Sequence, residues 1–234
     1  MPSVQTKIAN RVTTYLNTSY GTDININRLG LNWKGQLDIR ELYIADHHLD
    51  TLIFAQRVET DVLNLKNILN NNLEFVNTSL TGIKFYFKHY LDEQKNNLSV
   101  FADKFNTGKS SSGNPFKLEA NKLELSNASV KIIDENRETP EIFNLSKINI
   151  LANQLKLVGP EVSVDILQLS LLSERGFSIK NLEVYFSYTL DGIVLKNTKL
   201  ETAGSKINGD IELFHGGKGF SDFNNNVTIN AKLE

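Results

Sequence analysis

Apolar residues along most of the chain alternate with polar residues at a period of two, the pattern of strands with one buried face. After residue 115 no helical pattern occurs, and the turns are short, as at Val158-Gly159-Pro160, Leu190-Asp191-Gly192 and Thr202-Ala203-Gly204. Short turns between strands favour a meander of neighbouring antiparallel pairs. Strands are expected there at Phe116–Glu124, Ser129–Asp134, Lys147–Leu151, Gln154–Val158, Val162–Leu172, Phe177–Leu190, Ile193–Thr202, Lys206–Phe214 and Val227–Leu233.

Three segments before residue 106 have the three- and four-residue apolar spacing of helices. The first covers residues 3–20, where Ser3 can cap the start and Gly21 can end the helix. Its polar face carries few cations, so packing against the fold is favoured over a position on a membrane surface. Shorter helices are expected at Leu65–Asn70 and around Leu98–Phe105.

The strand pattern also contains irregularities and a weak repeat. The apolar positions slip by one residue twice, which predicts β-bulges near Arg28 and Arg40. Leu73–Leu80 resembles Leu123–Val130, and Leu195–Leu200 is a weaker copy, each with a central Asn. Because Asn tolerates the left-handed backbone of tight turns, each copy predicts a hairpin of strand, Asn turn and return strand.

Composition divides the chain into three regions. Residues 1–106 hold the N-terminal helix, the first strands and the two short helices, and residues 116–234 continue the sheet. Between them, residues 107–115 are rich in Gly and Ser and have the composition of a flexible linker. The alternation that begins at Val227 continues to the last residue, Glu234, without a turn, which indicates a piece of a longer chain.

Composition and motifs exclude several functions. The chain has 25 basic and 27 acidic residues, whereas surfaces that bind nucleic acid carry a basic excess. It has no cysteine, so disulfides, thiolate zinc sites and cysteine nucleophiles are absent. No phosphate loop, nucleophile elbow or other catalytic motif occurs, so we expect no enzyme, no catalytic residue and no cofactor.

One cluster, His47 and His48 between two aspartates, has a composition typical of metal sites. Neighbouring residues on an extended chain point to opposite sides, so these histidines are expected to lie in a solvated turn. The sequence therefore predicts no metal site.

The apolar positions, repeated over many strands, form a larger surface than the few predicted helices can cover. The sheet can close into a β-sandwich or an irregular barrel, or it can curl into an open groove. An open apolar lining suits acyl chains, since each buried methylene contributes about 0.8 kcal/mol. Alternation alone gives the candidate lining residues and leaves open whether this face of the strands or the opposite one lines the groove. The candidates are Ile83, Phe85, Phe87, Val162, Val164, Leu182, Val184, Phe186, Ile211 and Leu213.

Several apolar motifs between residues 2 and 105 follow one another in a characteristic order. They are Pro2-Ser3-Val4-Gln5-x-x-Ile8-Ala9, Tyr20-Gly21-Thr22-Asp23-Ile24-x-Ile26, Leu37-Asp38-Ile39-x-x-Leu42-Tyr43-Ile44-x-Asp46, Leu52-Ile53-x-Ala55, Leu63-x-Leu65-x-x-Ile68-Leu69, Ile83-x-Phe85 and Asn97-Leu98-x-x-Phe101-x-x-Lys104-Phe105. This order, more than any single motif, resembles the start of the TamB/AsmA-like family.

The apolar pattern and the resemblance together predict a mainly β (α+β) fold. An N-terminal amphipathic helix would be followed by an elongated, curled antiparallel β-sheet, an open β-groove, with two short helices. The resemblance also implies a periplasmic segment of a bacterial protein anchored in the inner membrane, with the membrane anchor expected upstream of Pro2.

The function that the resemblance implies is outer-membrane biogenesis, in which the groove carries phospholipid acyl chains between the two membranes. The alternative is a scaffold in a translocation and assembly module for protein secretion. Its open strand edges, expected at Lys206–Phe214, would pair with strands of β-barrel proteins or autotransporters, together with an outer-membrane barrel partner of the TamA/BamA type. A carbohydrate-active β-sandwich is less favoured, because paired carboxylates are missing.

Overall fold

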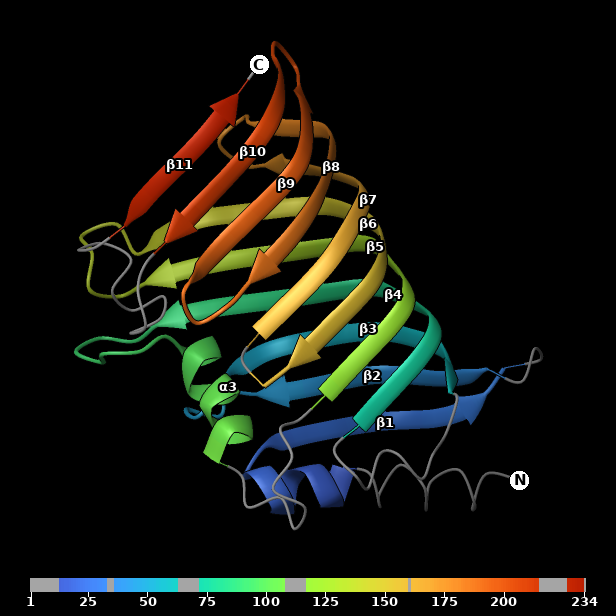
Figure 1. The fold of residues 1–234 in the computed structure, drawn as a ribbon. Helices are drawn as coiled ribbons and strands as arrows, with labels where there is room; N and C mark the ends of the chain where they lie inside the picture. The colour runs from blue at the N-terminus through green and yellow to red at the C-terminus, as the bar shows by residue number, and fades with distance from the viewer. Residues whose placement is uncertain are drawn as a thin grey trace.

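The computed structural model describes residues 13–32, 36–62, 72–107, 117–159, 161–214 and 227–233. These residues are mainly β and form one sheet of 11 strands in sequence order, with helical segments at residues 13–20 and in α3 (Asn97–Thr107) (Figure 1). The strands are β1 (Asp23–Leu31), β2 (Leu37–Ala45), β3 (Thr51–Val62), β4 (Asn72–His89), β5 (Lys117–Asp134), β6 (Glu141–Val158), β7 (Glu161–Ser173), β8 (Ser178–Tyr188), β9 (Gly192–Thr202), β10 (Lys206–Phe214) and β11 (Thr228–Leu233).

Each strand pairs with its neighbours in sequence, and every such pair is antiparallel except β4–β5. β4 and β5 run parallel, from Asn72 opposite Lys117 to His89 opposite Asp134. A parallel pair needs a crossover connection, and α3 lies in the segment that connects these two strands. The predicted meander is confirmed from β5 to β11, but the prediction of a wholly antiparallel sheet is wrong at β4–β5.

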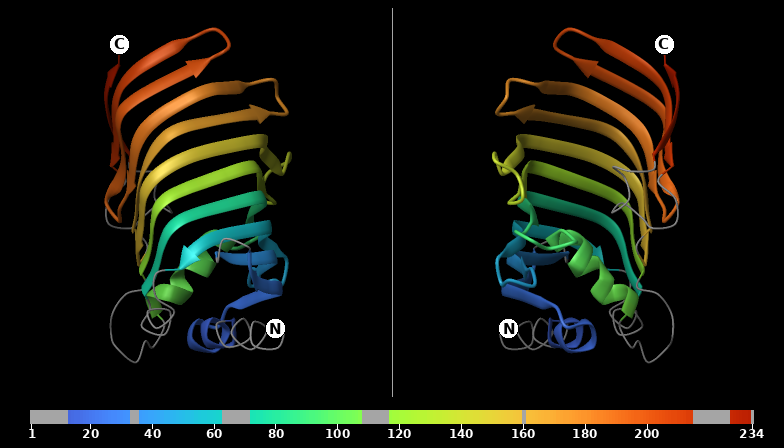
Figure 2. Two further views of the ribbon diagram at one scale, coloured as in Figure 1. Left: turned by 90° about the vertical axis from the view of Figure 1, so that its right-hand side faces the viewer. Right: turned by 90° about the vertical axis from the view of Figure 1, so that its left-hand side faces the viewer.

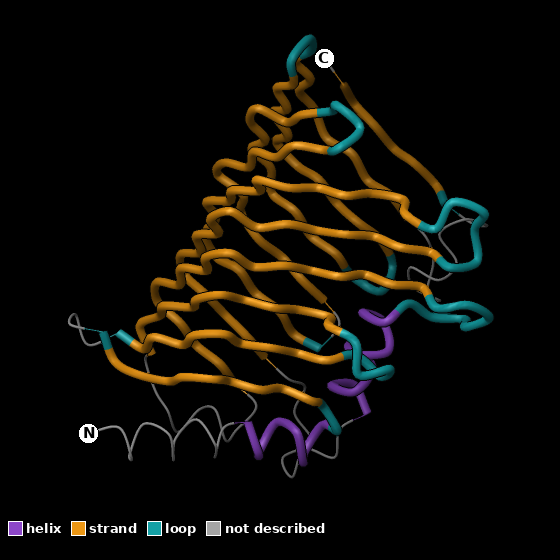
Figure 3. Tube along the Cα trace, turned by 180° about the vertical axis from the view of Figure 1, so that it is seen from behind, coloured by secondary structure: helices purple, strands orange, loops and turns teal. Residues whose placement is uncertain are grey.

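The sheet is open, with β1 and β11 as its two edges. The strands arch across it, as the side views show (Figure 2), but the sheet is not strongly curled. Seen from behind, the strands follow one another from the N-terminal helix to β11 (Figure 3), and the described residues form no second sheet. They therefore form neither the β-sandwich nor the closed barrel. The expected edge at Lys206–Phe214 is wrong, because this strand, β10, lies between β9 and β11.

Residues with a left-handed backbone interrupt the alternation inside several strands. Asn127 in β5, Lys147 in β6 and Asn197 in β9 have φ angles of 54, 49 and 54°. On either side of Asn127 the buried side chains are Leu125 and Ala128, three residues apart instead of two, and the register with β6 shifts there. These irregularities therefore act as bulges that keep apolar side chains on one face of a continuous strand.

The three repeat copies each lie within one strand, β4, β5 or β9, so the hairpins predicted at them are wrong. In the same way, the short strands predicted within residues 116–134 and 147–158 are parts of the long strands β5 and β6. Glu41, next to Arg40, has a φ of 53°, but the β1–β2 register does not shift at Arg28 or Arg40. The structure therefore has no register shift at either predicted bulge, and the only irregularity described near them is the left-handed backbone of Glu41.

Both described helices lie together beside the β1 end of the sheet (Figures 1 and 2). The helix predicted around Leu98–Phe105 is confirmed as α3, whose first turn is capped by Asn96. The Phe105 ring centroid lies 4.8 Å from that of Tyr20, at the end of the N-terminal helix. This contact joins the two helices, as expected for an N-terminal helix that packs against the fold.

Some predicted elements lie outside the described residues. They are the first part of the helix at residues 3–20, the helix at Leu65–Asn70 and most of the linker at residues 107–115. No helix among the described residues is long and apolar enough to cross a membrane.

Gly209 in β10 lies directly against the backbone of β11. Its φ is 151°, and a Cβ atom at this position would overlap the carbonyl oxygen of Lys232 in β11. Since both the backbone and the space favour glycine, we expect Gly209→Ala to lower the free energy of unfolding by about 2 kcal/mol and to displace β11. Hydrogen exchange followed by mass spectrometry would show faster exchange in β10 and β11.

The matched control for this substitution is Gly204→Ala in the turn between β9 and β10. Nothing lies within 4 Å of a Cβ atom there, so exchange in β11 should not change. Equal exchange of β11 amides in the Gly209→Ala variant and the unaltered protein would contradict the prediction.

Candidate functional site

The buried apolar side chains gather on one face of the sheet. Their central cluster spans β3 to β6, and each member is at most 8% exposed. The cluster consists of Ala55, Val58, Ile83, Leu125, Ala128 and Ile148. We call the side of the sheet that carries this cluster the apolar face.

The predicted lining residues of β4 lie on the apolar face. Ile83 belongs to the cluster, and Phe85 packs against it. The ring of Phe87 stacks on that of Phe85, with 5.9 Å between the ring centroids.

The strand register extends the apolar face beyond the cluster. Leu123, which packs against the cluster, lies opposite Ala152 in β6. Ala152 lies opposite Ile166 in β7, and Ile166 lies opposite Val184 in β8. Because directly opposed residues of neighbouring strands point to the same side, Val184 lies on the apolar face.

A second line of opposed residues continues from β7 to β10. Val164 lies opposite Phe186, Phe186 lies opposite Leu195, and Leu195 lies opposite Ile211. We call these four residues the apolar ladder. Residues two apart in a strand share a face, which adds the remaining predicted lining residues, Val162, Leu182 and Leu213. The structure thus brings all the predicted lining residues to one side of the sheet.

This part of the apolar face is open to solvent. Among the predicted lining residues only Ile83 and Val184, each 5% exposed, are buried, and the others are partly exposed. The described helix α3 packs against β4 and lies away from β7–β10 (Figure 2). No described element therefore covers the apolar ladder.

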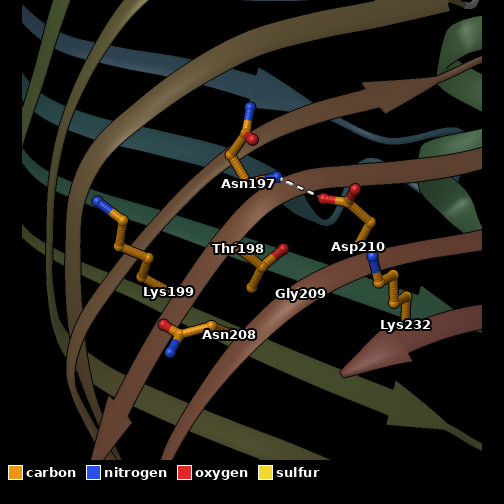
Figure 4. A pocket seen from close by; sticks show the side chains of 7 residues that line it. All are labelled: Asn197, Thr198, Lys199, Asn208, Gly209, Asp210 and Lys232. Carbon is orange, nitrogen blue, oxygen red and sulfur yellow. Dashed lines mark hydrogen bonds between the residues drawn. The ribbon is translucent and has the colours of Figure 1, made fainter. Parts of the chain in front are cut away.

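The other face of the sheet is polar where β7–β10 run. Asp165 lies opposite Tyr185, and Lys199 forms an ion pair with Glu183 at 3.0 Å. Two shallow hollows of about 290 and 250 Å³ border this region and share Asn197 and Lys199. The lining of the larger hollow is mostly polar (Figure 4), so it does not suit an acyl chain. It consists of Asn197, Thr198, Lys199, Asn208, Gly209, Asp210 and Lys232.

The turn predicted at the histidine pair is confirmed, but the prediction that the two side chains point to opposite sides is wrong. His47 and His48 do not point to opposite sides, because their Nε2 atoms lie 2.8 and 2.6 Å from the two carboxylate oxygens of Glu93. The chain is not extended there. Asp46 Oδ1 accepts hydrogen bonds from the backbone N–H groups of His48 and Asp50, which folds the segment into a tight turn.

Asp46 is 3% exposed and connects this turn to β4 and α3. Its Oδ2 accepts hydrogen bonds from the Tyr90 hydroxyl at 2.7 Å and the Asn97 side-chain amide at 2.9 Å. Burial alone raises the pKa of Asp46, but the hydrogen bonds from Asn97, Tyr90 and the turn amides outweigh it and hold the pKa below its usual value.

The sequence interpretation missed Glu93, Tyr90 and Asn97 as partners of this turn. The available signal was the aspartate that precedes the histidine pair, since Asp often accepts hydrogen bonds from the backbone two residues on.

The fold and the apolar face together define a class of protein, an open sheet of sequentially ordered strands with one accessible apolar side. No family model matches the chain, and a search of curated proteins finds no match.

Proposed function

We propose that the apolar face binds phospholipid acyl chains. The observation that carries the proposal is the apolar ladder, which crosses β7 to β10 without a described element over it. Monomeric proteins rarely leave a continuous apolar surface in water, and such a surface commonly marks a binding site. An acyl chain fits because it needs apolar contact and no specific polar partner.

The dimensions and energies agree with this ligand. Neighbouring strands lie about 4.8 Å apart, so the three spacings of the apolar ladder from β7 to β10 span about 14 Å. Burial of about ten methylene groups along this distance contributes about 8 kcal/mol before the entropic cost of binding. The arched strands would form a shallow open β-groove that holds the chains, while the headgroup remains in water.

The broader role is part of the same proposal. The chain would be a periplasmic segment of an inner-membrane-anchored, TamB/AsmA-like protein that carries lipid between the inner and outer membranes. The motif order of residues 2–105 and the sequential sheet support this role.

Two neighbouring residues of β8 provide a direct test. Phe186 belongs to the apolar ladder, whereas Tyr185 lies opposite Asp165 on the polar face and is 37% exposed. We expect Phe186→Glu to reduce co-purified phospholipid at least fivefold, because the carboxylate would have to lose its hydration beside an acyl chain. Native mass spectrometry of the chain purified from bacterial membranes under mild conditions measures the bound lipid.

Tyr185→Glu is the matched control, because it places the same charge one residue away on the other face. It should retain the lipid of the unaltered protein. Absence of bound lipid from the unaltered chain, or equal retention in both variants, would count against the proposal.

A second candidate function rests on the free edge of the sheet. Among the described strands β11 pairs only with β10, and its side chains are exposed, including Ile229 at 62% and Leu233 at 53%. Such an edge can accept a further strand, as a scaffold for the assembly of β-barrel proteins or autotransporters with a barrel partner of the TamA/BamA type would require. A photo-crosslinker at Asn230 would then label protein clients, whereas one at Ile211 would label lipid.

A further inference from the structure

Three side chains that commonly bind metals converge where the β2–β3 turn meets the segment after β4. One potential ligand atom each from His47, His48 and Glu93 lies within 4.8 Å of the other two. The two histidines and Glu93 are separated by 46 and 45 residues in sequence, so the fold and not local sequence brings them together. We propose that these three residues bind a divalent transition-metal ion, with zinc as the preferred ion.

The donor set fits this chemistry. Two imidazole nitrogens and one carboxylate oxygen are a donor set that binds zinc in proteins, with a fourth position for water. Bonds of about 2.0–2.1 Å in a tetrahedral site place the ligand atoms about 3.3 Å apart. The three ligand atoms, one from each side chain, lie within 4.8 Å of one another, so no pair has to move by more than about 1.5 Å to reach this spacing. The ion binds each neutral imidazole through Nε2, so the Nε2 protons of the hydrogen bonds to Glu93 leave to water and each ring then carries its proton on Nδ1.

The segments that carry the ligands are held in place without an ion. Asp46 fixes the turn with His47 and His48 through its two backbone hydrogen bonds. Glu93 is held by two contacts of its own backbone. Its carbonyl oxygen lies 2.7 Å from His89 Nε2, and the Glu93 backbone N–H donates a hydrogen bond to the carbonyl of Tyr90. The entropic cost of ordering the backbone when an ion binds is therefore small.

The site is accessible, and its surroundings suit a cation. The side chains of His47, His48 and Glu93 are 23, 45 and 30% exposed, which leaves a path for the ion and for a water ligand. The nearby cation, Lys88, is paired with Glu135 at 2.9 Å and Asp50 at 3.5 Å, so carboxylates offset its charge.

One feature limits the affinity. The Nδ1 atom of His47 is buried and has no hydrogen-bond partner among the described residues, whereas ligating histidines usually donate this N–H to a partner. Loss of such a partner typically weakens metal binding 10–100-fold, so we expect zinc to bind this site about 10–100-fold more weakly than a comparable site whose histidines both have such a partner.

Isothermal titration of the full chain, without a polyhistidine tag, with zinc chloride tests the proposal. The unaltered protein should bind one zinc ion, and His48→Gln and Glu93→Gln should each weaken binding at least tenfold. Glu183→Gln is the control. It removes a carboxylate of β8, far from the site, that pairs with Lys199 of β9, and it should leave zinc binding unchanged. X-ray absorption of the zinc-loaded chain should show two imidazole ligands.

A second measurement separates metal binding from a folding defect. Circular dichroism should show the same β content in His48→Gln and the unaltered protein, while zinc should raise the melting temperature of the unaltered protein only. No binding at 100 µM zinc, or equal affinity of the unaltered protein and both ligand variants, overturns the proposal.

Discussion

Replacing Leu52 with alanine is expected to lower the free energy of unfolding by about 3 kcal/mol, because it leaves a cavity in a closely packed region. Leu52 in β3 is 0% exposed and is the largest fully buried side chain among the described residues. The loss of Cγ and the two methyl groups removes apolar burial, and the surrounding strands can relax only partly. Urea denaturation followed by circular dichroism measures the change.

Leu49→Ala is the matched control for this prediction. Leu49 lies three residues earlier in the β2–β3 turn and is 72% exposed, so its truncation should change stability by less than about 0.5 kcal/mol. A loss below about 1 kcal/mol for Leu52→Ala would mean that the packing around β3 differs from the structure.

Replacing Asp46 with alanine is expected to cost about 3 kcal/mol, because it removes the common acceptor of a buried hydrogen-bond network. The Tyr90 hydroxyl would keep only its 3.0 Å contact with Asp50, and the Asn97 side chain would keep its two hydrogen bonds to the backbone of β4. Asn97 is 1% exposed and begins α3, so the loss should extend to this helix. Urea denaturation gives the loss of stability, and hydrogen exchange locates it.

Asp50→Ala is the control for the Asp46 substitution. The Asp50 side chain also accepts a hydrogen bond from Tyr90, but it is 61% exposed, so water can replace it and the cost should stay below about 1 kcal/mol. Similar losses in the two variants would refute the view that burial of Asp46 gives the network its strength.

The sequence predicted the helix α3 and several turns, because such elements form from residues that are close together in the chain. The apolar spacing of Leu98–Phe105 predicted α3, and the turns near Gly159, Asp191 and Ala203 do join consecutive strands. The alternation also placed the lining residues on a single side, because residues two apart share a face wherever no bulge intervenes.

Features that depend on distant partners could not be predicted in this way. Asn127 adopts the left-handed conformation predicted for the central Asn of the repeat. The same conformation occurs in hairpin turns and in bulges, and here the pairing of β5 with β6 makes it a bulge. The residues of β4 and β5 do not indicate whether these two strands pair parallel or antiparallel. For the same reason, the approach of Glu93 to His47 became visible only in the fold.

Because the strands follow one another in sequence order, the length of the sheet is proportional to the number of its strands. Each strand is bonded only to the strands before and after it in the chain, so the ten spacings between β1 and β11 correspond to about 48 Å. One more hairpin at the β11 edge would add about 10 Å without altering any existing pair. The distance that such a sheet bridges therefore grows in proportion to the length of its chain, and evolution can adjust that distance two strands at a time.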